Sequence, residues 1–146
     1  MQTYFDTSLL LKAYIPEAST PAALEIILAA NPPVPFSHIL ELELRTAIRL
    51  KHGRHEITAA AMKSALKAVA SDLAAGILVR PAYDLAAVYL RAEKISAMHA
   101  AATLARSADI LHIAAALESG CSVFASFDER QRRCAALTGL TLAPAR

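Results

Sequence analysis

Four acidic residues stand out because of the elements expected to carry them: Asp6, Glu43, Asp109 and Asp128. Asp6 and Asp128 each directly follow an apolar run that predicts a strand. Asp109 falls in the first turn of a predicted helix, and Glu43 falls within the apolar stripe of another. In an open parallel α/β sheet, strand ends and helix N-termini meet at the edge where ligands bind. We therefore expect the three aspartates at one edge, with Glu43 facing inward beneath it.

Each acid also has a purely structural explanation. Asp6 and Asp128 can cap the helices that follow them, and Gln131 lies at capping-box spacing from Asp128. Asp109 can complement a helix dipole, and Glu43 can reach solvent or pair with an arginine. If the acids gather in one cleft, however, their repulsion raises their pKa values and destabilises the fold unless a cation enters. Oxygen ligands without histidine or cysteine spacing favour Mg²⁺ or Mn²⁺, ions that assist phosphodiester cleavage.

Short apolar runs alternate with amphipathic segments, which predicts a short parallel sheet covered by helices on both faces. The first expected strand ends at Phe5. The others span residues 34–36, 77–79 and 123–127, and an edge strand is expected at 140–142. The expected helices span residues 9–15, 21–30, 38–52, 58–75, 84–98, 107–120 and 129–137. Their N-caps include Ser19 or Thr20, Ser37 and Ser107. On the helix from residue 38, Ile39, Leu40, Glu43, Ala47 and Leu50 share one face.

The composition narrows the class of protein. The 146 residues fit a single domain over residues 1–146. All four glycines fall at expected helix ends, so none remains for a phosphate-binding loop or a dinucleotide fingerprint. Cys121 and Cys134 have no zinc spacing and are expected to be reduced and half-buried. The chain has no apolar run of membrane-spanning length and no signal-peptide pattern, so we expect a cytoplasmic protein without a membrane partner.

Four passages, in a characteristic order and spacing, carry a resemblance to a known family. They are YFDTSLLLKAY (residues 4–14), SHILELELRTA (37–47), SADILHIAAA (107–116) and FASFDERQ (124–131). Together they resemble the PIN domain family, most closely the VapC-type toxin ribonucleases of bacterial type II toxin–antitoxin pairs. The resemblance implies a three-layer α/β/α fold with a short, mostly parallel central sheet. Glu43, and not Glu41, has the family spacing from Ser37, and Ser126 stands where the family usually has threonine.

The resemblance implies an Mg²⁺- or Mn²⁺-dependent endoribonuclease. Asp6, Asp109 and Asp128 would hold the metal, and Glu43 would complete the cluster and help orient the attacking water. The hydroxyls of Ser8 and Ser126 would orient the carboxylates. The implied partners are an RNA substrate, a cognate antitoxin whose tail fills the groove near the metal, and a second copy of the chain. The apolar helices at residues 9–15, 21–30 and 57–75 are the expected contact surfaces.

Other interpretations remain open. The chain can be a catalytically weak PIN-fold module that binds an antitoxin or another protein. A haloacid-dehalogenase-like phosphatase also places an aspartate after its first strand, but it needs a second one two residues on, where this chain has Ser8. His112 shares a helical face with Asp109 and is interpreted as a core histidine without a catalytic role. Two basic groups either follow an RNA backbone or are solvated surface: Arg45, Arg49, Lys51 and Arg54, and Arg130, Arg132 and Arg133.

Overall fold

The apolar run around Tyr4 forms strand β1 (Thr3–Phe5), from which the rest of the sheet is built. The structure is a computed structural model that describes residues 2–17 and 20–145. β1 pairs with β4 (Val123–Ala125), and β4 pairs with β5 (Thr141–Ala143). A second, two-stranded sheet joins β2 (Val34–Pro35) to β3 (Leu78–Val79). All these pairs are parallel, which confirms the predicted short parallel sheet.

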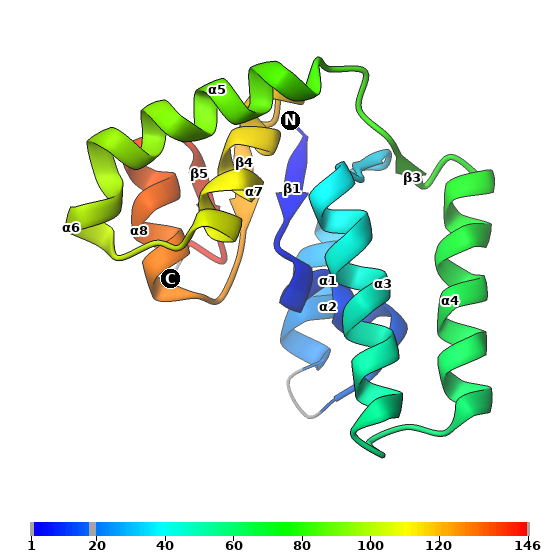
Figure 1. Ribbon diagram of the computed structural model, residues 1–146. Helices are drawn as coiled ribbons and strands as arrows, with labels where there is room; N and C mark the ends of the chain where they lie inside the picture. The colour runs from blue at the N-terminus through cyan, green and yellow to red at the C-terminus, as the bar shows by residue number, and fades with distance from the viewer. Residues whose placement is uncertain (1, 18–19, 146) are drawn as a thin grey trace.

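Helices lie between the strands along the chain, as expected when parallel strands need long crossovers. They are α1 (Thr7–Tyr14), α2 (Thr20–Ala29), α3 (His38–Gly53), α4 (Ala59–Ala74), α5 (Leu85–Ile95), α6 (Ala101–Thr103), α7 (Ser107–Glu118) and α8 (Glu129–Leu137). In Figure 1 the hairpin of α3 and α4 stands on one side of β1, and α5, α6 and α8 gather with β4 and β5 on the other. The predicted α/β/α fold is therefore confirmed.

Hydroxyl side chains start α3 and α4 as the sequence predicts. The Ser37 Oγ accepts a hydrogen bond from the Leu40 N–H at 3.2 Å, and the Thr58 Oγ1 accepts one from the Ala61 N–H at 3.1 Å. Just after the C-terminal end of α7, Gly120 adopts a φ of 75°, a left-handed conformation that glycine enters without a steric cost. The chain can therefore turn from α7 into β4 within a few residues.

Three predicted boundaries are wrong. β4 ends at Ala125 rather than Phe127, because the Ser126 carbonyl accepts from Arg132 and the Asp128 N–H donates to the Ser126 hydroxyl. The helix expected to end near Met98 instead continues through a π-helical turn, Ser96–Ala100, into α6. No glycine or proline follows Met98 to mark an end, and the chain leaves the helix only where Leu104 adopts a φ of 61°.

The third error is the start of α7. Ser107 is the first helical residue and not the cap, and the cap position belongs to Arg106. The side chain that closes this helix end is Asp109, whose Oδ2 accepts from the Arg106 N–H at 2.9 Å. At α2, Thr20 is the first helical residue, and the alternative cap Ser19 lies outside the described residues.

The core forms where the two halves of the chain meet around β1. Tyr4 and Phe124 are fully buried and stack with ring centroids 5.6 Å apart at an interplanar angle of 8°. Cys121 and Cys134 are buried free thiols, and burial raises the pKa of each. Across residues 2–17 and 20–145, no helix is long and apolar enough to cross a membrane.

The cap of α4 gives a test of the fold. Thr58→Ala removes the hydroxyl that satisfies a backbone N–H of the first turn, and we expect it to lower the free energy of unfolding by about 1 kcal/mol. Denaturant unfolding measures this loss. Ser64→Ala on the exposed side of the same helix is the matched control and should change the stability by less than about 0.5 kcal/mol. Equal losses in the two variants would contradict the capping role.

Candidate active site

The register of the sheet brings two predicted site segments to one edge. Phe5 lies opposite Ala125 at the C-terminal ends of β1 and β4, and the Asp6 N–H donates to the Ala125 carbonyl at 2.9 Å. Asp6 and the loop from Ser126 to Asp128 therefore leave the sheet side by side. This is the edge where open α/β sheets bind ligands.

Asp6 is a partly buried carboxylate directly after β1. It occupies the cap position of α1, yet its side chain makes no capping hydrogen bond. Its Oδ2 instead accepts from the Ser8 hydroxyl at 2.6 Å. Burial raises the pKa of Asp6 above its usual range, the Ser8 hydrogen bond and His112 oppose that rise, and the nearby charge of Glu43 adds to it. The ionised form of Asp6 is thus under-stabilised by the protein alone.

Glu43, on α3, has the opposite electrostatics. Its Oε1 accepts from the Thr7 hydroxyl at 2.7 Å and lies 2.5 Å from the His112 Nε2. The hydrogen bond from His112, followed by that from Thr7, holds the pKa of Glu43 below its usual range in spite of partial burial. Glu43 is therefore held as a carboxylate by the protein itself.

His112 is the buried centre of this hydrogen-bond network. Its side chain is 2% exposed, and its Nδ1 lies 2.8 Å from the Tyr4 hydroxyl. The Tyr4 hydroxyl in turn lies 2.5 Å from the Ser37 Oγ. The histidine is thus buried, as expected, and it also contacts a predicted site carboxylate, so the alternative that His112 hydrogen-bonds near the site describes it as well.

Asp6 and Glu43 open onto the same groove, which has a volume of about 680 Å³. Its remaining walls are mostly apolar: Thr7, Ser8, Leu11, Ile39, Leu42, Thr46, Ala47 and Leu50. The sequence stripe containing Glu43 was expected to face inward, but the core positions of α3 are Leu40, Leu44 and Ile48. Most of the stripe instead forms this groove wall, because the buried face of α3 is turned by about one residue from the predicted one.

Asp109 and Asp128 lie at helix starts, and both use a carboxylate oxygen to cap the backbone. The Asp109 Oδ2 accepts from the Arg106 N–H, and the Asp128 Oδ1 accepts from the Gln131 N–H, each at 2.9 Å. These are the structural roles that the sequence allowed for them. In all four predicted acids, at least one carboxylate oxygen already accepts a hydrogen bond from the protein.

Ser126 is fully buried and fixes the loop that carries Asp128. Its hydroxyl donates to the Gln131 Oε1 at 2.8 Å and accepts from the Asp128 N–H at 3.0 Å. It thus contacts the backbone of Asp128 and not its carboxylate. Ser8, by contrast, contacts the carboxylate of Asp6 directly.

The donor chemistry of these acids suits Mg²⁺ or Mn²⁺, which prefer carboxylate oxygens. Within the described part of the chain, however, no three His, Cys, Asp or Glu side chains are grouped so that they could hold a metal ion. Asp6 and Glu43 share a groove, and all four acids are not gathered into one cluster. Mutual repulsion of bare carboxylates opposes such a cluster. The metal-binding roles of the four residues remain predictions.

Several of the basic residues expected to follow RNA have partners inside the protein. Arg132 is buried and donates to the carbonyls of Ser126, Ala143 and Pro144, so it anchors β5 and cannot contact a nucleic acid. Arg45 pairs with Glu41, Lys51 pairs with Glu17 and Glu56, and Arg133 donates to the Ala102 carbonyl. Arg49, Arg54 and Arg130 are exposed.

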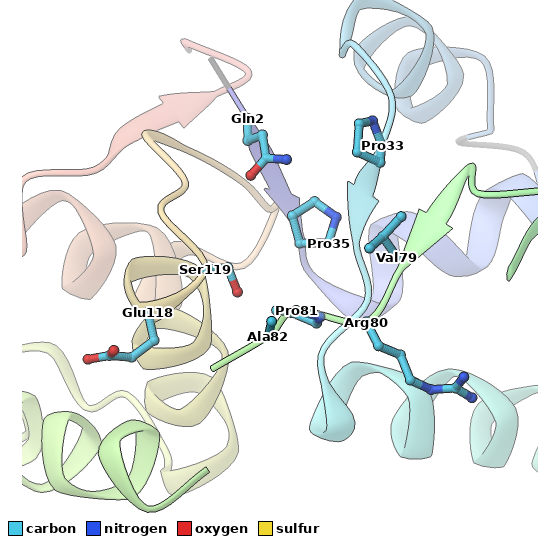
Figure 2. Close-up of a pocket in the computed structure, with 9 residues that line it drawn as sticks. All are labelled: Gln2, Pro33, Pro35, Val79, Arg80, Pro81, Ala82, Glu118 and Ser119. Carbon is cyan, nitrogen blue, oxygen red and sulfur yellow. The ribbon is translucent and has the colours of Figure 1, made fainter. Parts of the chain in front are cut away.

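A second hollow, of about 290 Å³, is lined by none of the four predicted acids (Figure 2). Its lining includes Gln2, three prolines, Arg80 and Glu118. Arg80 pairs with Glu41 at 2.8 Å, and Glu118 pairs with Arg91 at 2.6 Å, so both charges are compensated. This hollow therefore lacks the uncompensated acid that distinguishes the groove.

The comparison with protein families gives the match that decides the class. Residues 3–137 match the PIN domain. The chain belongs to the PIN domain family. A search of curated proteins finds no match. PIN domains are generally nucleases and typically bind divalent metal ions, so the match supports a nuclease-type function for the chain.

Sequence analysis gave no role to Tyr4 and Thr7 and preferred a core role for His112, yet all three contact the hydrogen-bond network of the candidate site. Tyr4 and Thr7 look like ordinary strand and helix-start residues. One signal was present, because His112 lies three residues after Asp109 and so shares a helical face with a predicted site residue. Only the fold shows that this face meets Glu43 across β1.

The two acids of the groove predict opposite pH effects on stability when no divalent cation is present. The pKa of Asp6 is raised, so its stabilising contribution is present below its usual range and is lost as the pH rises through the folded value. Asp6→Asn should therefore raise the free energy of unfolding at neutral pH and lose that advantage in acid.

The pKa of Glu43 is lowered, so its stabilising contribution is present above its usual range and is lost as the pH falls. Glu43→Gln should therefore lower the free energy of unfolding at neutral pH, with a smaller loss in acid. Denaturant unfolding in EDTA across this pH range measures both variants. A shift of the same sign for both at neutral pH would contradict the assignment.

Proposed function

We propose that this protein is an endoribonuclease that cleaves RNA phosphodiester bonds with the assistance of Mg²⁺ or Mn²⁺. Two findings support the proposal: the PIN domain match over residues 3–137, and the groove in which Asp6 and Glu43 lie together at the ligand-binding edge of the sheet. The groove is the stronger support. Asp6 is a partly buried carboxylate with a raised pKa, and Glu43 is a second carboxylate beside it, so the pair favours the entry of a cation.

The four predicted acids and the hydroxyls beside two of them would hold an ion and orient a water molecule. Asp6, Glu43, Asp109 and Asp128 are the carboxylates that would hold the divalent ion. When bound, such an ion lowers the pKa of a water molecule and offsets negative charge on the phosphate. Glu43, whose pKa is lowered, would stay ionised and help orient the attacking water. Ser8 and Thr7 keep the carboxylates of Asp6 and Glu43 in fixed orientations.

The exposed cations and the few aromatic residues favour recognition of the RNA backbone. Arg49 and Arg54 lie on α3 or just beyond it, on the same segment as Glu43, and Arg130 follows Asp128 closely. These guanidinium groups fit phosphates. Aromatic residues make up only 5% of the chain, so stacking platforms for bases are scarce.

We place this nuclease in the cytoplasm as the toxin of a toxin–antitoxin pair. Leu11, Leu42 and Leu50 give the groove apolar walls that suit a protein segment better than an RNA. An antitoxin segment with apolar side chains and a basic group would cover these walls and place its charge opposite Asp6 and Glu43. Such a partner would block the site, which suits a toxin held inactive.

A homodimer needs an exposed apolar surface. The side chains of Leu9 and Leu10 on α1 are buried, so these two residues cannot contribute to a dimer contact. Leu85, Tyr89 and Leu90 on α5 are large, apolar and exposed, and we place the dimer contact there.

A second candidate function is a PIN-fold binding module with little catalysis. The observation that favours it is that the described residues hold no ready-made group of three metal ligands. Titration calorimetry with Mn²⁺ separates the two candidates. The nuclease should release binding heat that is lost in Asp6→Asn, whereas the binding module should show none.

The nuclease proposal predicts that Asp6→Asn lowers RNA cleavage by at least about 100-fold, because the variant removes a charge needed at the site. EDTA should abolish cleavage by the wild type. Asp84→Asn is the matched control, because Asp84 occupies the cap position of α5, as Asp6 does for α1, but does not line the groove. Mapping of new RNA ends after expression of each variant in a host gives the measurement. Full activity of Asp6→Asn, or activity in excess EDTA, would sink the proposal.

The dimer proposal predicts that light scattering at micromolar concentration gives the mass of two chains. Tyr89→Asp should convert the dimer to a monomer, because it places a charge on the apolar surface of α5. Lys67→Asp on the exposed side of α4 is the control and should remain dimeric. A strictly monomeric wild type would refute the proposal.

A further inference from the structure

We propose that His112 is a positioning residue for Glu43, and that Tyr4 fixes the orientation of the His112 ring. The inference deepens the proposed nuclease function, on which its kinetic consequence rests. It assigns a role to His112 and Tyr4. Both side chains are buried in the core, and hydrogen bonds connect them to Glu43 in the candidate site.

The hydrogen bonds form one continuous chain from α3 through β1 to α7 and back to α3. The Leu40 N–H donates to the Ser37 Oγ, which lies 2.5 Å from the Tyr4 hydroxyl. The Tyr4 hydroxyl lies 2.8 Å from the His112 Nδ1, and the His112 Nε2 lies 2.5 Å from the Glu43 Oε1.

The chemistry of the two ends of this chain assigns its protons. An ionised Glu43 only accepts, so the hydrogen between it and His112 belongs to Nε2. In a neutral ring Nδ1 is then the acceptor, and the Tyr4 hydroxyl donates to it. Tyr4 accepts in turn from Ser37, whose remaining lone pair takes the Leu40 N–H. Under this one assignment the hydroxyls of Ser37 and Tyr4, both ring nitrogens of His112 and the Glu43 Oε1 all have hydrogen-bond partners.

The packing leaves the ring little freedom to turn. His112 is 1% exposed, and its partner Tyr4 is fully buried and stacked on Phe124. The Thr7 hydroxyl, 3.3 Å from the His112 Nε2, completes the surroundings of that nitrogen. A buried polar side chain without partners is costly, so these contacts select one ring orientation.

The consequence for Glu43 is that its two oxygens have different roles. Both His112 and Thr7 contact Oε1, and Oε2 accepts no hydrogen bond from any residue in the described part of the chain. One oxygen anchors the carboxylate, and the other is presented to the groove. A residue that acts on a reactive carboxylate in this way typically changes activity by about 10–100-fold when it is removed.

The first test needs no activity. Two-bond ¹H–¹⁵N correlation spectra of protein labelled in its five histidines, at neutral pH, report which ring nitrogens carry protons. The His112 signals are those lost in His112→Gln. We expect a protonated Nε2 in the wild type and a changed Nδ1 signal in Tyr4→Phe, which lacks the hydroxyl that contacts Nδ1. An unprotonated Nε2 in the wild type, or an unchanged spectrum in Tyr4→Phe, would overturn the inference.

The second test measures kcat and KM for RNA cleavage. His112→Leu removes the donor to Glu43 and should lower kcat by about 10–100-fold with little change in KM. His112→Gln keeps an N–H donor in a side chain of similar reach, so it should recover most of that loss. His52→Gln is the matched control, because His52 is a part-buried histidine on α3 that hydrogen-bonds to the Ile57 carbonyl and does not line the groove.

The outcomes of these tests are separable. If the wild type cleaves RNA and His112→Leu keeps the wild-type kcat, the inference fails while the nuclease proposal stands. If the wild type cleaves no RNA, the nuclease proposal fails, and the nitrogen spectra still decide whether His112 positions Glu43. Should His112→Leu not fold, the comparison of His112→Gln with Tyr4→Phe and the wild-type spectrum carries the decision.

Discussion

The hydrogen bond between His112 and Glu43 joins two residues that are 69 positions apart in the chain. It ties α7 to α3 across β1, and the Tyr4 hydroxyl, which reaches both His112 and Ser37, lies between them. A buried imidazole must find partners for both of its nitrogens, and a half-buried carboxylate must find donors. These requirements can be met together only if both helices and the strand sit in one relative arrangement. The network that serves the candidate site is thus also a constraint on the fold.

The two carboxylates of the groove show how position sets chemistry. Glu43 has donors from α1 and α7 and is stable as an anion, whereas Asp6 has one serine hydroxyl and is destabilised by burial. The groove therefore holds one anion that the protein stabilises and one that it does not fully stabilise. Such pairs of acids with pKa values driven apart are found at sites that move protons or bind cations.

Much of this arrangement could be predicted from the sequence because it depends on local rules. Short segments of sequence predict the cap at Ser37, the glycine after α7 and the alternation of strands and helices. Each of these features is present in the structure. The placement of Asp6 followed from strand parallelism alone. What the sequence could not give was the rotation of α3 about its axis, since leucines occur on both of its faces. Because of this rotation, most of the residues that share a face with Glu43 line the groove and are not in the core.

The same limit explains His112 and Arg132. Both are polar residues whose hydrogen-bond partners come from distant segments. The residues next to them in the sequence do not predict those partners. Arg132 looked like a surface cation near Asp128 and is instead a buried anchor for β5. Helix ends without glycine or proline were missed for a related reason, because α6 ends through the backbone conformation of Leu104 rather than through a residue type that favours a stop.

The hydrogen bonds that the four acids already make affect which ion can be selected. Glu43, Asp109 and Asp128 each commit one oxygen to a donor in the protein, and Asp6 commits one to Ser8. A cation at this edge would meet carboxylates that coordinate through a single oxygen. Calcium favours six to eight oxygens, often with bidentate carboxylates, whereas magnesium takes octahedral geometry and keeps several waters. If the proposed ion binds at this edge, the capping bonds of α7 and α8 would favour an ion that keeps coordinated water over one that needs bidentate carboxylates.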